Sequence, residues 1–189
     1  MTAETLDPKT FINPAILLAG TVDDQMYAQF REQLDNAPAK GVVAIELSTL
    51  GGDPEIARMI GEDMRYHSEQ DPGRSFVFLG KTAVYSAGVT LMSFFARENR
   101  YLTRGTRLMV HERQMHKQLA IEGPLTSAIQ IVRASLHEIE ASIAIQNEGF
   151  ENLIKGSRLT MEQVLEKTPS NWYLDAQEAL DLGLVQAVL

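Results

Sequence analysis

The chain has 189 residues, of which 44% are hydrophobic and 22% charged, as is usual for one globular domain with a substantial core. Its 17 Lys and Arg against 25 Asp and Glu give a net charge of −8, and no basic block could neutralise a row of phosphates, so nucleic acid is not an expected partner. The lack of cysteine excludes a disulfide framework, a thiolate zinc site and a cysteine nucleophile.

The N-terminal segment, MTAETLDPKTF, contains no apolar signal-peptide core. No run of about 18 apolar residues, the length of a membrane-spanning helix, occurs in the sequence. We therefore expect a cytoplasmic protein without membrane contacts.

The next part of the chain alternates short apolar runs with helical periods, which is typical of an α/β domain. Residues 15–22 and 41–47 are predicted to be buried strands. The intervening segment 23–37 is predicted to be helical because its apolar residues recur every four positions. A second helix is expected over 55–69, and a third strand over 75–80 follows a Pro-Gly break.

Ser86 follows that third strand and a turn, and it begins a helix that we expect to reach about Arg97. Two roles fit a serine there. As an N-cap it would satisfy a free backbone N–H of the first helical turn. As a nucleophile it would place an oxyanion beside those N–H groups, at the positive end of the helix dipole.

Two more features lie at element ends. Gly51-Gly52 follows the strand 41–47, where a glycine pair forms either a tight turn or a loop that points an N–H at a ligand. His111 ends a predicted strand over 107–110, which follows a short strand over 101–103, and a general base must stand within about 3 Å of the hydroxyl that it deprotonates. The other histidines are expected to be surface residues: His67, His116 and His137.

From Pro124 to about Ile154 the pattern predicts one long helix. Its apolar residues are spaced alternately by four and three positions: Leu125, Ile129, Val132, Leu136, Ile139 and Ile143. Such a seam favours packing against another helix, and packing on the chain's own domain remains an alternative. Capping boxes at Thr160 and Asp175 predict two short helices, and a strand is expected over 184–189.

The order and spacing of these motifs resemble the proteolytic subunit family of the Clp protease, ClpP. The resemblance rests on Gly51-Gly52 after a strand, Ser86-Ala87-Gly88 opening a helix, RLMVHE with its His111, the long helix and the closing LDAQEALDLGLV, and it runs from about Ala15 to Leu189. It implies an α/β, crotonase-like spiral of β-β-α units with a protruding handle helix.

The resemblance also implies a serine endopeptidase that needs neither a cofactor nor a metal. Ser86 would attack the peptide carbonyl and His111 would accept its proton, while the N–H groups of Gly52 and Ala87 would hold the oxyanion. The substrates would be peptides or unfolded proteins, which an ATP-driven AAA+ unfoldase delivers to the family's chamber.

The same resemblance predicts one Clp-type domain over 1–189. Its head would comprise about 15–123 and 156–189, and its handle about 124–155. In the family, such handles join two heptameric rings, so a homo-oligomer, with two stacked heptameric rings as its form, is expected.

One position departs from the family pattern, because Asn171 stands where an aspartate is expected as the third member of the triad. An amide oxygen can accept the Nδ1–H of His111 and fix its tautomer, but it supplies no charge. Asp175 is the alternative third member, although its capping box also predicts a helix cap.

Three other functions stay open at this stage. A catalytically silent or weak ring subunit, acting as a scaffold, is compatible with Asn171. A crotonase-type acyl-CoA enzyme would share the fold and the oxyanion hole but would not use Ser86 and His111. A relative of signal-peptide peptidases would use a lysine base, for which Lys81 is the nearby candidate.

Overall fold

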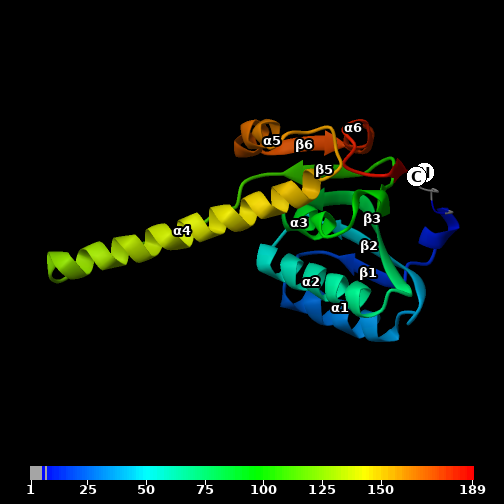
Figure 1. Cartoon of the computed structure of the whole chain (residues 1–189), viewed down its shortest axis with the longest axis horizontal. Helices are drawn as coiled ribbons and strands as arrows, with labels where there is room; N and C mark the ends of the chain where they lie inside the picture. Colours follow the sequence, from blue (N-terminus) through cyan, green and yellow to red (C-terminus); the bar gives the residue numbers. More distant parts are fainter. Residues whose placement is uncertain (1–5, 7) are drawn as a thin grey trace.

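The computed structural model describes residue 6 and residues 8–189, and its described residues form a seven-stranded sheet (Figure 1). The strands are β1 (Ile16–Ala19), β2 (Gly41–Thr49), β3 (Arg74–Tyr85), β4 (Arg100–Leu102), β5 (Arg107–Val110), β6 (Trp172–Asp175) and β7 (Ala187–Val188). The main order is β1-β2-β3-β4-β7, while β5 pairs with β3 and β6. All pairs are parallel except β5–β6.

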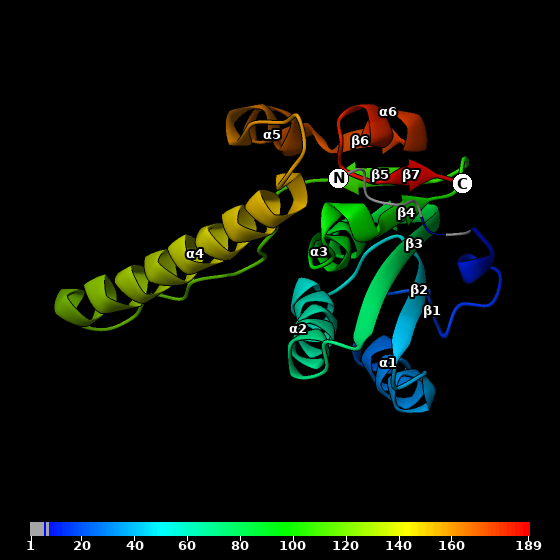
Figure 2. The same ribbon diagram turned by 45° about the vertical axis from the view of Figure 1, so that its right-hand side comes forward.

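In the described part of the chain, six α-helices and three short 3-10 turns accompany these strands. The helices are α1 (Asp24–Asn36), α2 (Pro54–Gln70), α3 (Ala87–Ser93), α4 (Leu125–Ile154), α5 (Met161–Lys167) and α6 (Ala176–Asp181). The 3-10 turns are η1 (Pro8–Phe11), η2 (Arg97–Asn99) and η3 (Thr168–Ser170). Figure 2 shows α1 and α2 together on one side of the sheet. The predicted four-residue spacing in α1 is confirmed, because Met26, Phe30 and Leu34 are all buried.

Alternate residues of β2 enter two different hydrophobic clusters. Val43, Ile45 and Leu47 face the main core, into which α1, α2, α3 and the base of α4 pack. On the other face, Ala44 joins a smaller cluster that includes Phe11 of η1. The strand is therefore buried on both faces over its central part, as parallel strands usually are.

β3 is longer than the predicted 75–80, and this extension positions the site. Its first half pairs with β4 and its last residues pair with β5. Between these halves the register with β2 shifts, and Thr82 adopts a positive φ of 61°. The strand is thus bent rather than ended, so Ser86 follows Tyr85 directly and no turn intervenes.

The long helix α4 projects from the rest of the chain (Figure 1). Its base is held by Arg100, which is 1% exposed and donates hydrogen bonds to the carbonyl oxygens of Asn152 (2.9 Å) and Leu153 (2.6 Å). Arg100 also donates to the carbonyl oxygens of Ser93 and Phe95, just where α3 ends. Burial lowers the pKa of Arg100 to about 10, which leaves it charged at neutral pH.

Two other predictions differ in their bounds, and one strand was not predicted. The helix expected to reach about Arg97 ends at Ser93, since Arg100 and a tighter final turn take up the carbonyls of its end. The closing strand is confined to Ala187–Val188. β6 was not predicted; its aromatic residues follow the Pro-Ser-Asn turn and form a short antiparallel partner for β5.

Among residue 6 and residues 8–189, no helix has both the length and the hydropathy to cross a membrane.

Candidate active site

Ser86 and His111 lie together at adjacent strand ends. His111 Nε2 is 2.7 Å from Ser86 Oγ, a hydrogen-bond distance. The backbone sets this contact: Tyr85 pairs with Met109, and the Ser86 N–H donates to the Met109 carbonyl at 2.8 Å. Ser86 precedes α3 but makes no capping bond with its side chain, so the interpretation as an ordinary N-cap is wrong.

The backbone of Ser86 is strained, with φ 53° and ψ −113°. A non-glycine residue in such a sparsely populated region costs on the order of 1–3 kcal/mol, and residues of this kind gather at active sites. The same sharp strand-to-helix turn exposes the nucleophilic serine in the α/β-hydrolases. The geometry therefore presents Oγ at the end of the strand instead of burying it in the helix cap.

The loop at Gly51-Gly52 lies beside Ser86. A Cβ placed on Gly51 would be 3.0 Å from the Ser86 Cβ. Gly52 forms a parallel bridge with Val22. The Val22 N–H donates to the Gly51 carbonyl, and the Val22 carbonyl accepts a hydrogen bond from the Asp53 N–H. This pattern leaves the Gly52 N–H without a hydrogen bond among the described residues, and the Ala87 N–H at the start of α3 is likewise free. Both N–H groups are thus available to a ligand.

A cleft of about 450 Å³ contains Ser86 and His111. Its walls come from the Gly52 loop and the start of α2, from α3, from the segment after β5, and from the base of α4. Phe94 and Phe150 supply aromatic surface, and Ile139 and Ile143 of the predicted seam also line the cleft. A mostly apolar groove with a few convergent polar groups is typical of a substrate site.

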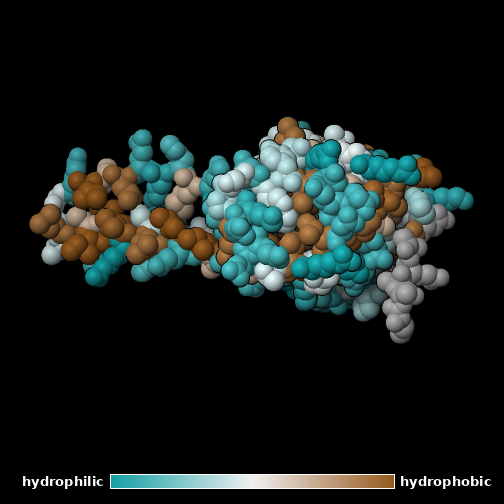
Figure 3. Space-filling model, turned by 90° about the horizontal axis from the view of Figure 1, so that it is seen from above, coloured by the Kyte–Doolittle hydropathy of each residue, from teal (hydrophilic) through white to brown (hydrophobic). Residues whose placement is uncertain are grey.

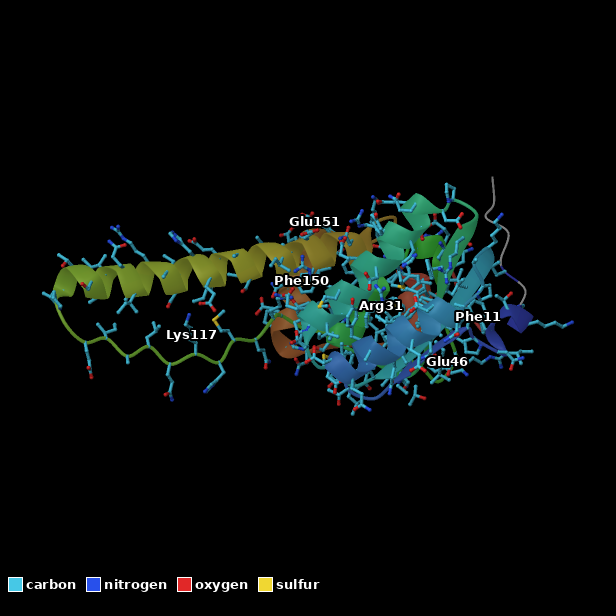
Figure 4. All side chains as sticks on the ribbon, turned by 90° about the horizontal axis from the view of Figure 1, so that it is seen from below. Phe11, Arg31, Glu46, Lys117, Phe150 and Glu151 are labelled. Carbon is cyan, nitrogen blue, oxygen red and sulfur yellow. The ribbon has the colours of Figure 1, made fainter. Side chains whose placement is uncertain are left out.

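The segment between β5 and α4 runs outward beside α4 to the far end of that helix, as Figure 4 shows near the labelled Lys117. It is fastened at two points. The Arg113 N–H donates to the Gln146 side chain at 2.7 Å, and Lys117 forms an ion pair with Glu138. The cleft therefore continues along the helix from the head.

The third member of a triad is not in place. Nδ1 of His111 is buried and has no hydrogen-bond partner within the described residues. The β5–β6 ladder ends at the pair Val110–Trp172. If the ladder continued by one residue, Asn171 would pair with His111. Asn171, however, leaves the strand conformation with a φ of 54°, and its side chain is exposed. The predicted hydrogen bond between Asn171 and His111 is therefore absent from this conformation.

Asp175 has the capping role that its sequence motif predicts. Its carboxylate accepts the Glu178 N–H at 2.8 Å and pairs with Arg107 at 3.2 Å, across the β5–β6 ladder. Hydrogen bonds from the Glu178 backbone and from Arg107 lower the pKa of Asp175. The folded state therefore favours the carboxylate form of Asp175. The cap stabilises the fold at pH values above the ordinary carboxyl pKa, and this stabilisation is lost as the pH falls through the lowered pKa.

The remaining candidates lie outside the cleft. Lys81 forms an ion pair with Glu46 at 2.7 Å, so it is not the base for Ser86. The other three histidines do not line the cleft; His116 and His137 are exposed and His67 is partly buried.

Comparison with known proteins gives a family. The model of the family described as Clp protease matches residues 8–189. The chain belongs to the Clp protease family. It is 24% identical over 177 residues to the ATP-dependent Clp protease proteolytic subunit 2 of Pseudomonas aeruginosa, with 92% of this chain and 80% of that protein covered.

The fold is that of ClpP. Among solved structures, an Asn-to-Asp mutant of ClpP1 from Listeria monocytogenes is similar, with a TM-score of 0.71, 20% identity, and coverage of 92% of this chain and 90% of that chain. The α/β fold with a parallel sheet and a long helix, expected from the motifs, is confirmed.

Proposed function

We propose that this Clp-family chain is a serine endopeptidase that cleaves peptides or unfolded proteins. The observation that carries the proposal is the 2.7 Å contact between Ser86 Oγ and His111 Nε2, at a strained strand-to-helix turn beside two free backbone N–H groups. A serine, a base within hydrogen-bond reach and two oxyanion donors are the parts that acyl transfer requires.

In the proposed reaction, Ser86 Oγ attacks the carbonyl carbon of the scissile bond while His111 Nε2 accepts the hydroxyl proton. The N–H groups of Gly52 and Ala87 stabilise the negative charge on the former carbonyl oxygen. His111 then protonates the leaving amine, which leaves an acyl ester on Ser86. Water, deprotonated by the same base, hydrolyses this ester and restores the serine.

The experiment that tests this proposal is hydrolysis of internally quenched peptides by the wild-type chain. Turnover that a fluorophosphonate blocks supports a serine peptidase. An assembled, folded chain that cleaves no peptide supports the second candidate, a silent or weak ring subunit, which the unpartnered Nδ1 of His111 favours. Thioester chemistry is not proposed, because it gives the Ser86–His111 hydrogen bond no role.

Replacement of Gly52 by alanine is expected to lower kcat about 10²- to 10³-fold, as loss of one oxyanion donor does in other enzymes. A Cβ at this position would lie 2.3 Å from the Val22 carbonyl oxygen, so the loop and its N–H must move. Gly20→Ala is the matched control: Gly20 also has a left-handed φ, of 105°, but a Cβ there meets nothing within 4 Å. Equal kcat losses in the two variants would show that backbone strain, and not the Gly52 N–H, causes the effect.

For the orienting group, we propose that Asn171 turns toward His111 when substrate binds. Asn171→Asp should then raise kcat about tenfold or more, because a carboxylate stabilises the imidazolium that forms in the transition state. The similar Listeria structure is also of an Asn-to-Asp mutant. Stopped-flow or steady-state peptide hydrolysis measures the change.

Asp175→Ala is the comparison variant. It should lower the melting temperature by a few degrees, as loss of an N-cap does, and leave kcat nearly unchanged. If Asp175→Ala abolishes turnover in a chain that melts normally while Asn171→Asp has no effect, the orienting role belongs to Asp175.

Assembly and partners are also proposals. The apolar seam of α4 is solvent-exposed in the single chain, with Leu125 82% and Leu136 50% exposed, and Figure 3 shows apolar surface along the projecting arm. We propose a head over 15–123 and 156–189, a handle over 124–155 that joins copies into two stacked rings, and delivery of substrate by an ATP-driven unfoldase. The words "ATP-dependent" in the name of the Pseudomonas relative support this last point.

A further inference from the structure

A charged cluster lies at the rim of the catalytic cleft, between the oxyanion loop and the strand that carries the base. Glu55, in the first turn of α2, accepts a hydrogen bond from Arg58 on one carboxylate oxygen, at 2.6 Å, and from Arg113 on the other, at 2.5 Å. Arg113 is two residues beyond His111, and Glu55 is three residues beyond Gly52. Arg58 and Arg113 both line the cleft that contains Ser86.

The cluster has one positive charge in excess, since two guanidinium groups share one carboxylate. Each guanidinium uses one nitrogen on Glu55, and its other nitrogens make no hydrogen bond with the described residues. The side chains of Arg58 and Arg113 are 33% and 21% exposed, so their charges are screened less than those of free surface arginines.

From these observations we propose that Arg58 and Arg113 form a carboxylate subsite, which selects an acidic side chain of the peptide bound in the cleft. The planar fork of arginine matches a carboxylate with two parallel hydrogen bonds, and several of its donors are unused here. Glu55 holds both guanidinium groups in place before substrate arrives, which reduces the ordering cost of binding. The inference deepens the proposed peptidase function and rests on it for the identity of the ligand.

The lowered pKa of Glu55 indicates a positive local field at the carboxylate subsite. Burial raises the pKa of Glu55, but hydrogen bonds from Arg113 and Arg58 outweigh burial, so the pKa lies below its ordinary value. A second carboxylate at the same guanidinium groups would be favoured in the same way.

Two acidic residues also line the cleft, and neither neutralises the carboxylate subsite by contact. They are Glu112, which directly precedes Arg113, and Glu148 of α4. No ion pair joins either acid to Arg58 or Arg113 within the described residues.

The test measures binding separately from chemistry. Full-length Ser86→Ala chain is titrated with fluorescein-labelled peptides in which one Glu is moved along a neutral sequence, each matched by the Gln peptide, and anisotropy gives Kd. At one position the Glu peptide should bind about tenfold more tightly than the Gln peptide. Because the whole chain carries a charge of −8, other positions should show no such preference.

Matched variants assign the effect. Added to Ser86→Ala, the pair Arg58→Gln and Arg113→Gln should reduce the Glu preference to about twofold or less, while Arg65→Gln leaves it intact. Arg65 is on the same helix and is paired with Glu62 and Glu69, but it does not line the cleft. Glu55→Gln should weaken the Glu preference because it no longer holds both guanidinium groups in place, and it should leave binding of the Gln peptides unchanged, whereas a purely structural role for Glu55 would weaken binding of both peptides.

The outcomes separate the subsite from the peptidase proposal. If no position prefers Glu, if no peptide binds, or if the preference survives loss of both arginines, the carboxylate subsite is wrong. If the preference follows the arginines but wild-type chain cleaves none of the peptides, the subsite stands and the peptidase function fails. Raising NaCl from about 50 to 500 mM on the Ser86→Ala chain should weaken the Glu peptides alone, which checks the charge without a substitution in the subsite.

Discussion

Ser86→Ala is expected to lower kcat for peptide hydrolysis by about 10⁴- to 10⁶-fold. The nucleophile and base of a serine peptidase act as a unit, so loss of either removes nearly all of the covalent route. The variant would keep His111 and the oxyanion donors of Gly52 and Ala87 but would have no nucleophile. Its melting temperature should change little, because within the described residues Ser86 Oγ hydrogen-bonds to His111 alone.

A second serine in the same cleft provides the control. Ser93 lies at the end of α3, lines the cleft, and donates its hydroxyl hydrogen to the Thr90 carbonyl at 2.7 Å, away from any base. Ser93→Ala should therefore leave kcat within a few-fold of the wild-type value. Cleavage that persists in Ser86→Ala, or that disappears only in Ser93→Ala, contradicts the assignment of the nucleophile.

The second large effect concerns assembly. Replacing Ile129 and Leu136 by lysine should convert the assembled chain into single rings or monomers. Both side chains are half-exposed on the projecting helix, 51% and 50%, and belong to the seam that we expect another copy to cover. A buried unpaired ion carries an effective penalty of several kcal/mol, and an assembly repeats it at every contact.

Sedimentation velocity measures this change, with Ser127→Lys and Ala134→Lys as the matched control. These two residues are exposed on α4 and lie two positions from seam residues, so they face away from the seam. The control adds the same charge and should keep the wild-type sedimentation coefficient. A wild-type chain that already sediments as a monomer at micromolar concentration would overturn the handle interpretation.

The sequence was sufficient to predict that Ser86 and His111 lie within hydrogen-bond reach of each other. Ser86 and His111 both stand at the ends of apolar runs, and parallel strands bring such ends to one edge of the sheet. The apolar seam was equally visible, because its spacing repeats from Leu125 to Ile143 of α4. Capping boxes at Thr160 and Asp175 were read correctly, since their signals involve only residues three apart.

Other parts depend on tertiary contacts that no local pattern encodes. The strain at Ser86 follows from the bend in β3, where one half pairs with β4 and the other with β5. The early end of α3 depends on Arg100, whose charge alone indicated a surface residue although it is 1% exposed. The contact of Arg113 with Glu55 and Arg58 was not predicted, because these residues come from two distant segments. The sequence signals it only by charged residues that follow Gly51-Gly52 and His111.

The most direct test of the account is the site at which a fluorophosphonate modifies the wild-type chain, determined by peptide mapping in a mass spectrometer. Fluorophosphonates react with serines that a neighbouring base activates, so the reading does not depend on the choice of peptide. We expect one phosphonylated residue, Ser86, and no adduct at Ser93 or on a His111→Ala chain. An unmodified Ser86 in folded protein, or an adduct at another serine, would contradict it.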